Sequence, residues 1–391
     1  MDAVRRRRWP RRLALGAGAL ALAVVAAWAF LWRPVAPAAA LLARLAGPLP
    51  TPADLTAAGA TRWVGGASLP PVVPTLDVPG PTADAPLVLL VAGVTPEGIA
   101  DARVGRLALA LRAAGCAVVA PEVRGLTRPG DDSDLVGEVV GAWSAALRGD
   151  PPRRRVAMLG VSLGAGLVVR AIARGAPGDP PADSVSAVLL VGPPDDVVAL
   201  APRWFREPVA PASATGAADA RSDAGCFARH RILRAATATL VPQPDRAAVH
   251  RWLDEVGERP AGAIDGPPGL ASEPAARLVR VTRAEADLSA ADLAWVLGAA
   301  RPFLEATSPA AAPVGALDRL RMPVFVLHGL ADPLVPAEES DRLRDRLRAA
   351  RTDVLKSTLL SHVDVGSPGL LDTWHHLRFV QGFLDEAEAR R

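Results

Sequence analysis

Apolar residues follow two patterns along this 391-residue chain. Short unbroken runs, such as Pro86 to Val91 and Val185 to Val191, alternate with segments such as Ile99 to Ala114, in which apolar positions repeat at helical spacing. Unbroken runs of about 4–8 residues are typical of parallel strands that are buried on both faces. The alternation therefore predicts an α/β fold, with a mainly parallel sheet flanked by helices.

The alternation is interrupted in the second half of the chain. Residues 193–316 hold helical segments broken by Pro, Gly and Ala clusters, and aromatic residues at helical spacing indicate that these segments pack on something. We interpret them as a helical cap inserted into a core that comprises residues 61–192 and 317–391. Three aromatic residues of the cap favour an apolar acyl or aryl group in the pocket below: Trp204, Trp252 and Trp295.

The N-terminal region has the pattern of a membrane segment. Residues 13–32 carry no charge and are long enough to cross a bilayer as a helix, and the basic residues 1–12 favour a cytoplasmic N-terminus. The rest of the protein would then lie outside the cytoplasm. The alternative is a secretory signal cleaved near residues 37–40, which would release the protein. Residues 33–60, rich in Pro and Ala, are expected to form a tether and a first amphipathic turn.

The charge distribution argues against a nucleic-acid partner. The formal net charge is +3, and six arginines within residues 5–12 leave the remainder nearly balanced. No basic stripe is interleaved with aromatic residues, as single-strand binders require. The two cysteines, Cys116 and Cys226, lack metal-ligand spacing. The sequence predicts no metal site and no cofactor.

A nucleophile is indicated by the segment Gly160 to Gly164, which reads G-x-S-x-G around Ser162. An apolar run precedes it and a small-residue helical pattern follows it. In this strand, turn and helix context the serine hydroxyl lies exposed at the tip of a sharp turn. The segment predicts that Ser162 attacks an electrophile.

A serine nucleophile needs an imidazole to take its proton and a carboxylate behind that imidazole. Asp332 lies just after one predicted strand and His362 just after the last one. Reactive groups of open parallel sheets gather at the carboxyl ends of strands, so these residues are expected to converge with Ser162.

Other residues compete for two of these roles. Asp195 and Asp196 follow an earlier strand and are a second choice for the acid. His328, at a strand end, is expected to be structural or to line the site. Four more histidines fall within helical patterns of the cap or of the final helix: His230, His250, His375 and His376.

The segment HGLADPLVPAEES, which starts at His328, resembles the α/β-hydrolase pattern of a strand, His-Gly, the catalytic Asp, Val-Pro and a helix. The resemblance covers about residues 60 to 390. It implies an α/β-hydrolase fold, with Ser162 as nucleophile, Asp332 as acid and His362 as base.

The same resemblance implies an oxyanion hole made by two backbone N–H groups, those of Leu163 and Val94. The chain departs from the family here, because Ala92-Gly93-Val94 stands where many members have His-Gly-x. The hole survives such a change, since its donors are main-chain groups, but the support of the loop is left open.

These observations predict a serine hydrolase that cleaves an ester or similar acyl bond of a small-molecule substrate through an acyl-enzyme. Two alternatives stay open: an acyltransferase that uses the same acyl-serine, and a membrane-tethered, non-catalytic binding module. Peptidases and thioesterases share this machinery. The sequence identifies neither the substrate nor the oligomeric state.

Overall fold

The computed structural model describes residues 35–63, 74–95, 97–130, 134–149, 152–206, 220–257, 269–283, 288–358 and 370–388. Strands in these residues form one eight-stranded sheet with the order β1-β2-β4-β3-β5-β6-β7-β8. Their bounds are Thr61–Trp63 (β1), Thr75–Val78 (β2), Leu87–Val91 (β3), Ala117–Pro121 (β4), Val156–Val161 (β5), Val185–Val191 (β6), Val324–Gly329 (β7) and Thr352–Ser357 (β8). The pairs β1–β2 and β2–β4 are antiparallel and the other pairs are parallel, which confirms the mainly parallel sheet.

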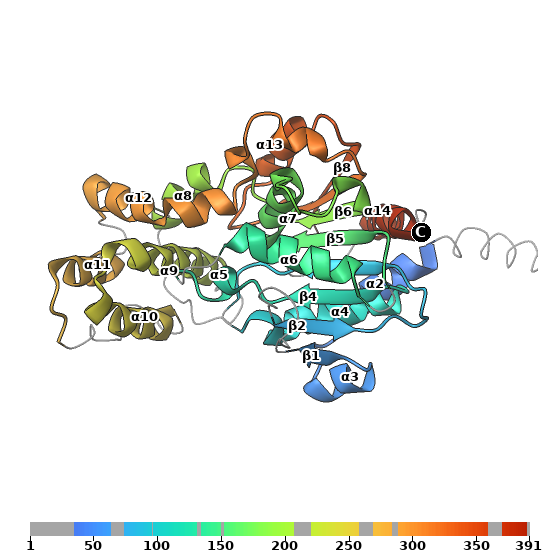
Figure 1. The fold of residues 1–391 in the computed structure, drawn as a ribbon, viewed down its shortest axis with the longest axis horizontal. Coiled ribbons are helices and arrows are strands. Elements are labelled where there is room, and N and C mark those ends of the chain that lie inside the picture. The colour runs from blue at the N-terminus through green and yellow to red at the C-terminus, as the bar shows by residue number, and fades with distance from the viewer. Residues whose placement is uncertain are drawn as a thin grey trace, which may run out of the picture.

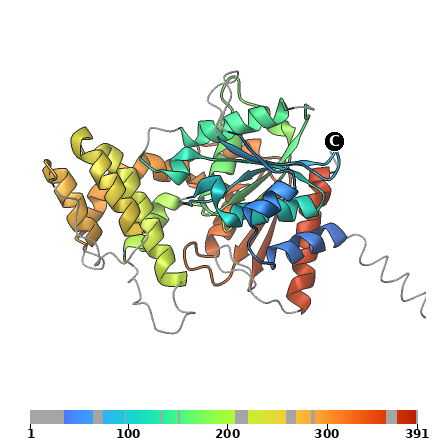
Figure 2. The ribbon, with the colours of Figure 1, turned by 90° about the horizontal axis from the view of Figure 1, so that it is seen from below.

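The central strands are apolar throughout because both of their faces are covered. Along β3, Val88 and Leu90 point into one core and Leu89 and Val91 into the other, as the two-residue period of a strand requires. The sheet lies between two layers of helices (Figure 2). One layer contains α2 (Ala36–Leu45), α4 (Ala102–Ala113) and α14 (Leu370–Glu388), and the other contains α6 (Leu135–Leu147), α7 (Leu163–Arg174) and α13 (Glu338–Arg346).

A helical unit connects β6 to β7 within the residues predicted as a cap. It projects from the end toward which the parallel strands point (Figure 1). Its helices are α8 (Val197–Arg206), α9 (Ala220–Leu240), α10 (Gln243–Gly257), α11 (Glu273–Arg283) and α12 (Ala290–Ala306). The unit is joined to the core by side-chain hydrogen bonds: Arg231 donates to the carbonyl of Thr127 at 3.3 Å and Arg234 to that of Pro129 at 2.7 Å.

Residues 33–60 were predicted to form a tether, but their described part, residues 35–60, is not an extended linker. It contains α2 and a short helix, α3 (Pro52–Ala57), and α2 packs on the core between α4 and α14. Val35, Ala38 and Leu41 are buried at a spacing of three residues, which gives α2 an apolar stripe. The Pro- and Ala-rich composition indicated a linker, whereas the stripe makes this segment part of the core.

No helix in the described part of the chain is long and apolar enough to cross a membrane. The predicted membrane segment, residues 13–32, lies outside the described residues.

Candidate active site

Ser162 occupies a sharp turn between β5 and α7. Its backbone φ is 52° and its ψ is −126°, and among the described residues it is the only one other than glycine with a positive φ. Such a conformation costs about 1–3 kcal/mol and persists only where the surroundings enforce it. Here the Ser162 N–H donates to the carbonyl of Val191 on β6 at 2.8 Å, which ties the turn to the neighbouring strand.

The glycines on either side of Ser162 allow this turn to pack. A Cβ on Gly164 would lie 2.3 Å from the carbonyl oxygen of Ala92, and one on Gly160 would lie 2.5 Å from the Cα of Ala165. A side chain at either position would collide with backbone. The G-x-S-x-G spacing therefore has a steric cause in this fold, and the turn has the geometry of a nucleophile elbow.

The loop that follows β3 lies directly against the nucleophile. A Cβ on Gly93 would be 3.1 Å from the Cβ of Ser162. The next residue, Val94, is half-buried, and Leu163 begins α7, whose N-terminus favours negative charge. Both predicted oxyanion donors thus belong to segments that adjoin Ser162.

A hydrogen-bonded network that we had not predicted supports the β3 loop. The hydroxyl of Thr95 donates to the buried carboxylate of Asp101 at 2.7 Å, and the guanidinium of Arg103 donates to both oxygens of that carboxylate. Burial pushes the pKa of Asp101 up, but the hydrogen bonds from Arg103 and Thr95 outweigh burial and lower that pKa. This network supplies a support for the loop that carries Ala92 in place of histidine.

Asp332 lies in the turn after β7 with its side chain fully buried. One carboxylate oxygen, Oδ1, accepts the backbone N–H groups of Leu334 and Val335, both at 2.8 Å. These two bonds fix the carboxylate in one orientation and favour its charged form. The other oxygen, Oδ2, lies 3.4 Å from Nε2 of His328.

His328 was predicted either to be structural or to line the site, and its contacts are structural. Its imidazole is fully buried, with Nδ1 hydrogen-bonded to the hydroxyl of Ser340 and Nε2 at 2.9 Å from the carbonyl of Val335. Both ring nitrogens have a hydrogen-bond partner. His328 therefore holds the turn that carries Asp332 and has no free nitrogen with which to serve as a base.

The alternative candidates for the catalytic acid, Asp195 and Asp196, make structural contacts instead. The buried carboxylate of Asp195 accepts Nε of Arg346 with both oxygens, at 2.7 and 2.8 Å. Burial raises the pKa of Asp195, and the Arg346 guanidinium opposes that rise. The neighbouring Asp196 uses its carboxylate to accept the Ala199 N–H at the start of α8. These contacts favour Asp332 as the acid.

The strands that precede the three predicted residues, β5, β7 and β8, lie in the same half of the sheet, with β6 between β5 and β7. β5, β6 and β7 are neighbours, so Ser162 and Asp332 follow strands two spacings apart, about 10 Å. β8 ends at Ser357, whose carbonyl accepts the N–H of Leu330 in the Asp332 turn at 2.7 Å. The predicted base, His362, lies outside the described residues, five positions after Ser357.

The cap tryptophans that suggested an apolar pocket differ in what they do. Trp204 donates its Nε1–H to the carbonyl of Leu334 at 2.9 Å and so joins α8 to the Asp332 turn. Trp252 is buried in the cap, and Trp295 stacks under the guanidinium of Arg277 at 4.2 Å. Two of the three therefore stabilise the cap itself.

No group of His, Cys, Asp or Glu side chains within the described ranges is placed to hold a metal ion.

Comparison with known proteins gives similarity of fold alone. No protein-family model and no curated protein matches the sequence. Similar solved structures include a candidate lipase from Acinetobacter baumannii, at 13% identity and TM-score 0.45, which covers 88% of this chain and 100% of the other. An acylaminoacyl peptidase from Pyrococcus horikoshii has 12% identity and TM-score 0.44, over 85% of this chain and 42% of the other. A meta-cleavage product hydrolase from Pseudomonas fluorescens has 19% identity and TM-score 0.41, over 81% and 95%.

Proposed function

We propose that the protein is a serine hydrolase that cleaves an ester or similar acyl bond of a small molecule. The observation that carries this proposal is the strained Ser162, held at a strand-to-helix turn with the β3 loop against its Cβ. Backbone strain of this kind is retained where it serves a function. The buried, oriented carboxylate of Asp332 two strands away is the second element.

In the proposed reaction the Ser162 hydroxyl attacks the acyl carbon while His362 takes its proton. Asp332 holds the imidazole and stabilises the imidazolium that forms. The N–H groups of Leu163 and Val94 bind the oxyanion, and each such donor contributes about 3–4 kcal/mol of transition-state stabilisation. The leaving group departs with the proton from His362. Water then attacks the acyl-serine, with His362 as base, and the acid product is released.

Labelling with a fluorophosphonate probe tests the nucleophile. The wild-type chain should gain the mass of one phosphonyl group on Ser162, and Ser162→Ala should gain none and lose hydrolysis of p-nitrophenyl esters. Ser144→Ala, a change on α6, serves as the matched control and should label normally. Full esterase activity in Ser162→Ala would refute the proposal.

The role of His362 requires a separate test, with another histidine as its control. His362→Gln should abolish both labelling and turnover, because the serine then has no proton acceptor. His375→Gln, on the exposed side of α14, should leave both unchanged. Product analysis with added alcohols and amines separates hydrolysis from acyl transfer: a hydrolase forms the free acid in their presence.

We also propose that residues 13–32 anchor the protein in a membrane, with the hydrolase domain outside the cytoplasm. Two buried residues, Val35 and Ala38, support an uncleaved segment, because cleavage near residues 37–40 would remove one or both of them from the core. Intact-mass measurement of the membrane-extracted chain tests this. A mass that lacks the first 30–40 residues would contradict it.

A further inference from the structure

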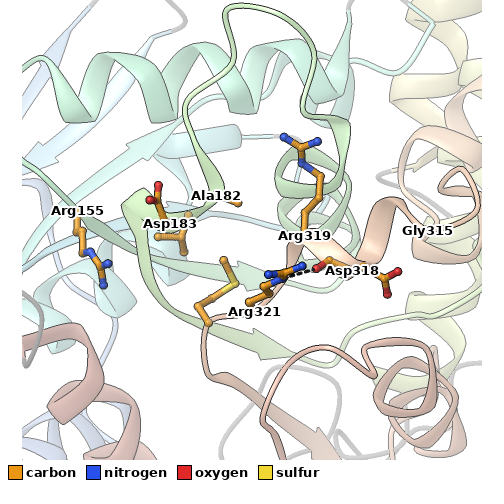
Figure 3. A pocket seen from close by; sticks show the side chains of 9 residues that line it. Arg155, Ala182, Asp183, Gly315, Asp318, Arg319 and Arg321 are labelled. Atoms are coloured by element: carbon orange, nitrogen blue, oxygen red, sulfur yellow. Dashed lines mark hydrogen bonds between the residues drawn. The ribbon is translucent and has the colours of Figure 1, made fainter.

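A pocket with three arginines lies at the amino ends of the parallel strands, the opposite end of the sheet from Ser162. Its volume is about 510 Å³, and its lining includes the residues just before β5, β6 and β7. Figure 3 shows Arg155 on the β5 side and Arg319 with Arg321 on the other side. Two acidic residues, Asp183 and Asp318, also line it.

Arginines gather at this end of the sheet. We define the amino-end arginine cluster as Arg153, Arg154, Arg155, Arg319 and Arg321. None of the five forms an ion pair with a carboxylate in the described part of the chain. At the other end of the molecule three arginines of the cap pair with carboxylates, in Arg234–Asp254, Arg277–Asp292 and Arg280–Glu273.

The arginines of the cluster contact backbone carbonyls and the end of a helix. Arg153 donates to the carbonyls of Ala83 and Ala85, and Arg321 donates Nε to the carbonyl of Asp318 at 3.3 Å. These bonds go to neutral carbonyl oxygens, whereas the charge of Arg319 interacts with the nearby carboxylate of Asp179. Arg319 lies against Gly175 at the C-terminal end of α7, where the helix dipole favours a cation.

The chain enters the fold at this same end. The N–H of Ala38 in α2 donates to Gln381 of α14 at 3.2 Å, and Glu386, one turn further along α14, pairs with Arg351 just before β8. Figures 1 and 2 likewise place α2 and the C-terminal end of α14 opposite the cap. The first described residue, Val35, is already buried at 1% exposure.

The short connection fixes how far this end can be from a membrane. The predicted membrane segment ends at residue 32, so two residues, 33 and 34, separate it from Val35, a span of at most about 10 Å. Guanidinium groups bind phosphate oxygens in bidentate geometry and are drawn to anionic lipid surfaces over about a Debye length. A bilayer attached this closely would face the end of the sheet that carries the amino-end arginine cluster.

We propose that the amino-end arginine cluster binds the phosphate groups of anionic phospholipids and seats the domain on the membrane with its cap directed away. The proposal rests on residues 13–32 being a membrane segment, and it is independent of the hydrolase reaction. Asp183 and Asp318 oppose an anion, which limits the surface to multivalent contact with many headgroups rather than tight binding of one phosphate.

The test uses the full chain in nanodiscs made of phosphatidylcholine alone or with added phosphatidylglycerol. A dye is placed at Val314→Cys, a fully exposed position beside the pocket, and its quenching by headgroup-labelled lipid is measured. Cys116 is buried, and the chain without the new cysteine gives the background. Quenching should be stronger with phosphatidylglycerol, and it should fall when salt is raised from about 0.1 M to about 1 M, where the Debye length drops to about 3 Å.

Neutralising the arginines should show whether this surface, rather than positive charge anywhere on the protein, makes the contact with the lipid. Arg155→Gln, Arg319→Gln and Arg321→Gln together should lower the ratio of docked to undocked domain by on the order of 10²-fold, at roughly fivefold per arginine. A matched triple on the cap, Arg206→Gln, Arg251→Gln and Arg280→Gln, should leave quenching unchanged.

Several results would overturn the proposal. Equal quenching in both lipids means that the short connection alone sets the distance, and lipid-dependent quenching retained in the first triple means that other residues make the contact. Loss of quenching on adding inorganic phosphate at constant ionic strength indicates a site for a soluble phosphate instead. If the chain inserts into discs of neither composition, residues 13–32 are not a membrane segment and the proposal fails, whatever the esterase activity of the chain.

Discussion

The two ends of the sheet use charge in opposite ways. At the carboxyl end, Asp101, Asp195 and Asp332 are buried, and each accepts two or more hydrogen bonds. A buried charge without partners is costly, so those partners also fix each carboxylate in place. At the amino end, the arginine cluster lies at the surface and forms no close ion pair with a carboxylate in the described part of the chain. The carboxyl end thus has the fixed geometry that catalysis requires, and the amino end has charge that is available to another surface.

The largest effect should come from changing Asp332, the carboxylate proposed as the catalytic acid. Asp332→Asn should lower kcat/KM for an ester substrate by about 10⁴-fold, because the amide favours the wrong imidazole tautomer. Oδ1 of asparagine still accepts the two backbone N–H groups, so the fold should be retained, which circular dichroism checks. Asp196→Asn is the control, since asparagine caps a helix as well as aspartate does. An equal loss in both variants would show that general damage, not catalysis, was measured.

Steric crowding at the elbow should give the next largest effect. Gly164→Ala places a methyl group 2.3 Å from the Ala92 carbonyl and should destabilise the fold by about 1–3 kcal/mol, with a loss of activity. Gly141→Ala in α6 meets nothing within 4 Å and should stabilise by up to about 1 kcal/mol. Urea unfolding of both variants measures the difference. Opposite signs are expected, and a destabilised Gly141→Ala would contradict the steric explanation.

The network behind the β3 loop should show a smaller effect that depends on pH. The folded pKa of Asp101 is lowered, so its contribution is present above the unfolded pKa of about 3.9 and is lost as pH falls through the folded value. Asp101→Asn should therefore cost about 1 kcal/mol at pH 7, and the difference from wild type should shrink below about pH 4. Unfolding at several pH values checks the sign. A difference that grows in acid would contradict it.

The smallest effect should come from the amino end. The triple change of Arg155, Arg319 and Arg321 to Gln should shift the free energy of unfolding by no more than about 0.5 kcal/mol per site, as for other surface positions. Hydrolysis of a soluble ester should stay at the wild-type rate. A marked loss of turnover would mean that the two ends of the sheet are coupled and would remove the contrast between them.

Residue patterns were sufficient to predict the sheet and the elbow. The apolar runs at β3, β5, β6 and β7 were predicted as strands buried on both faces, and the glycines around Ser162 matched a turn whose crowding the structure explains. His362 stays a prediction, because it lies outside the described residues.

Other features depend on contacts between distant residues, which no local pattern carries. The support from Thr95, Asp101 and Arg103 belongs to no motif, although an aspartate two residues before an arginine at a helix start was a possible sign of it. The docking of α2 was hidden by a composition typical of linkers, and only the spacing of its buried residues indicated a helix face. The cap tryptophans pointed to a pocket because burial inside a cap and lining of a cleft have the same sequence pattern.

The position of α2 has a consequence for how substrate arrives. β5 is six residues long, so Ser162 stands about 20 Å beyond the amino end at which the chain would leave the bilayer. A lipid molecule would have to leave its leaflet entirely to reach the serine. Substrates of the proposed reaction should therefore diffuse in from the aqueous side.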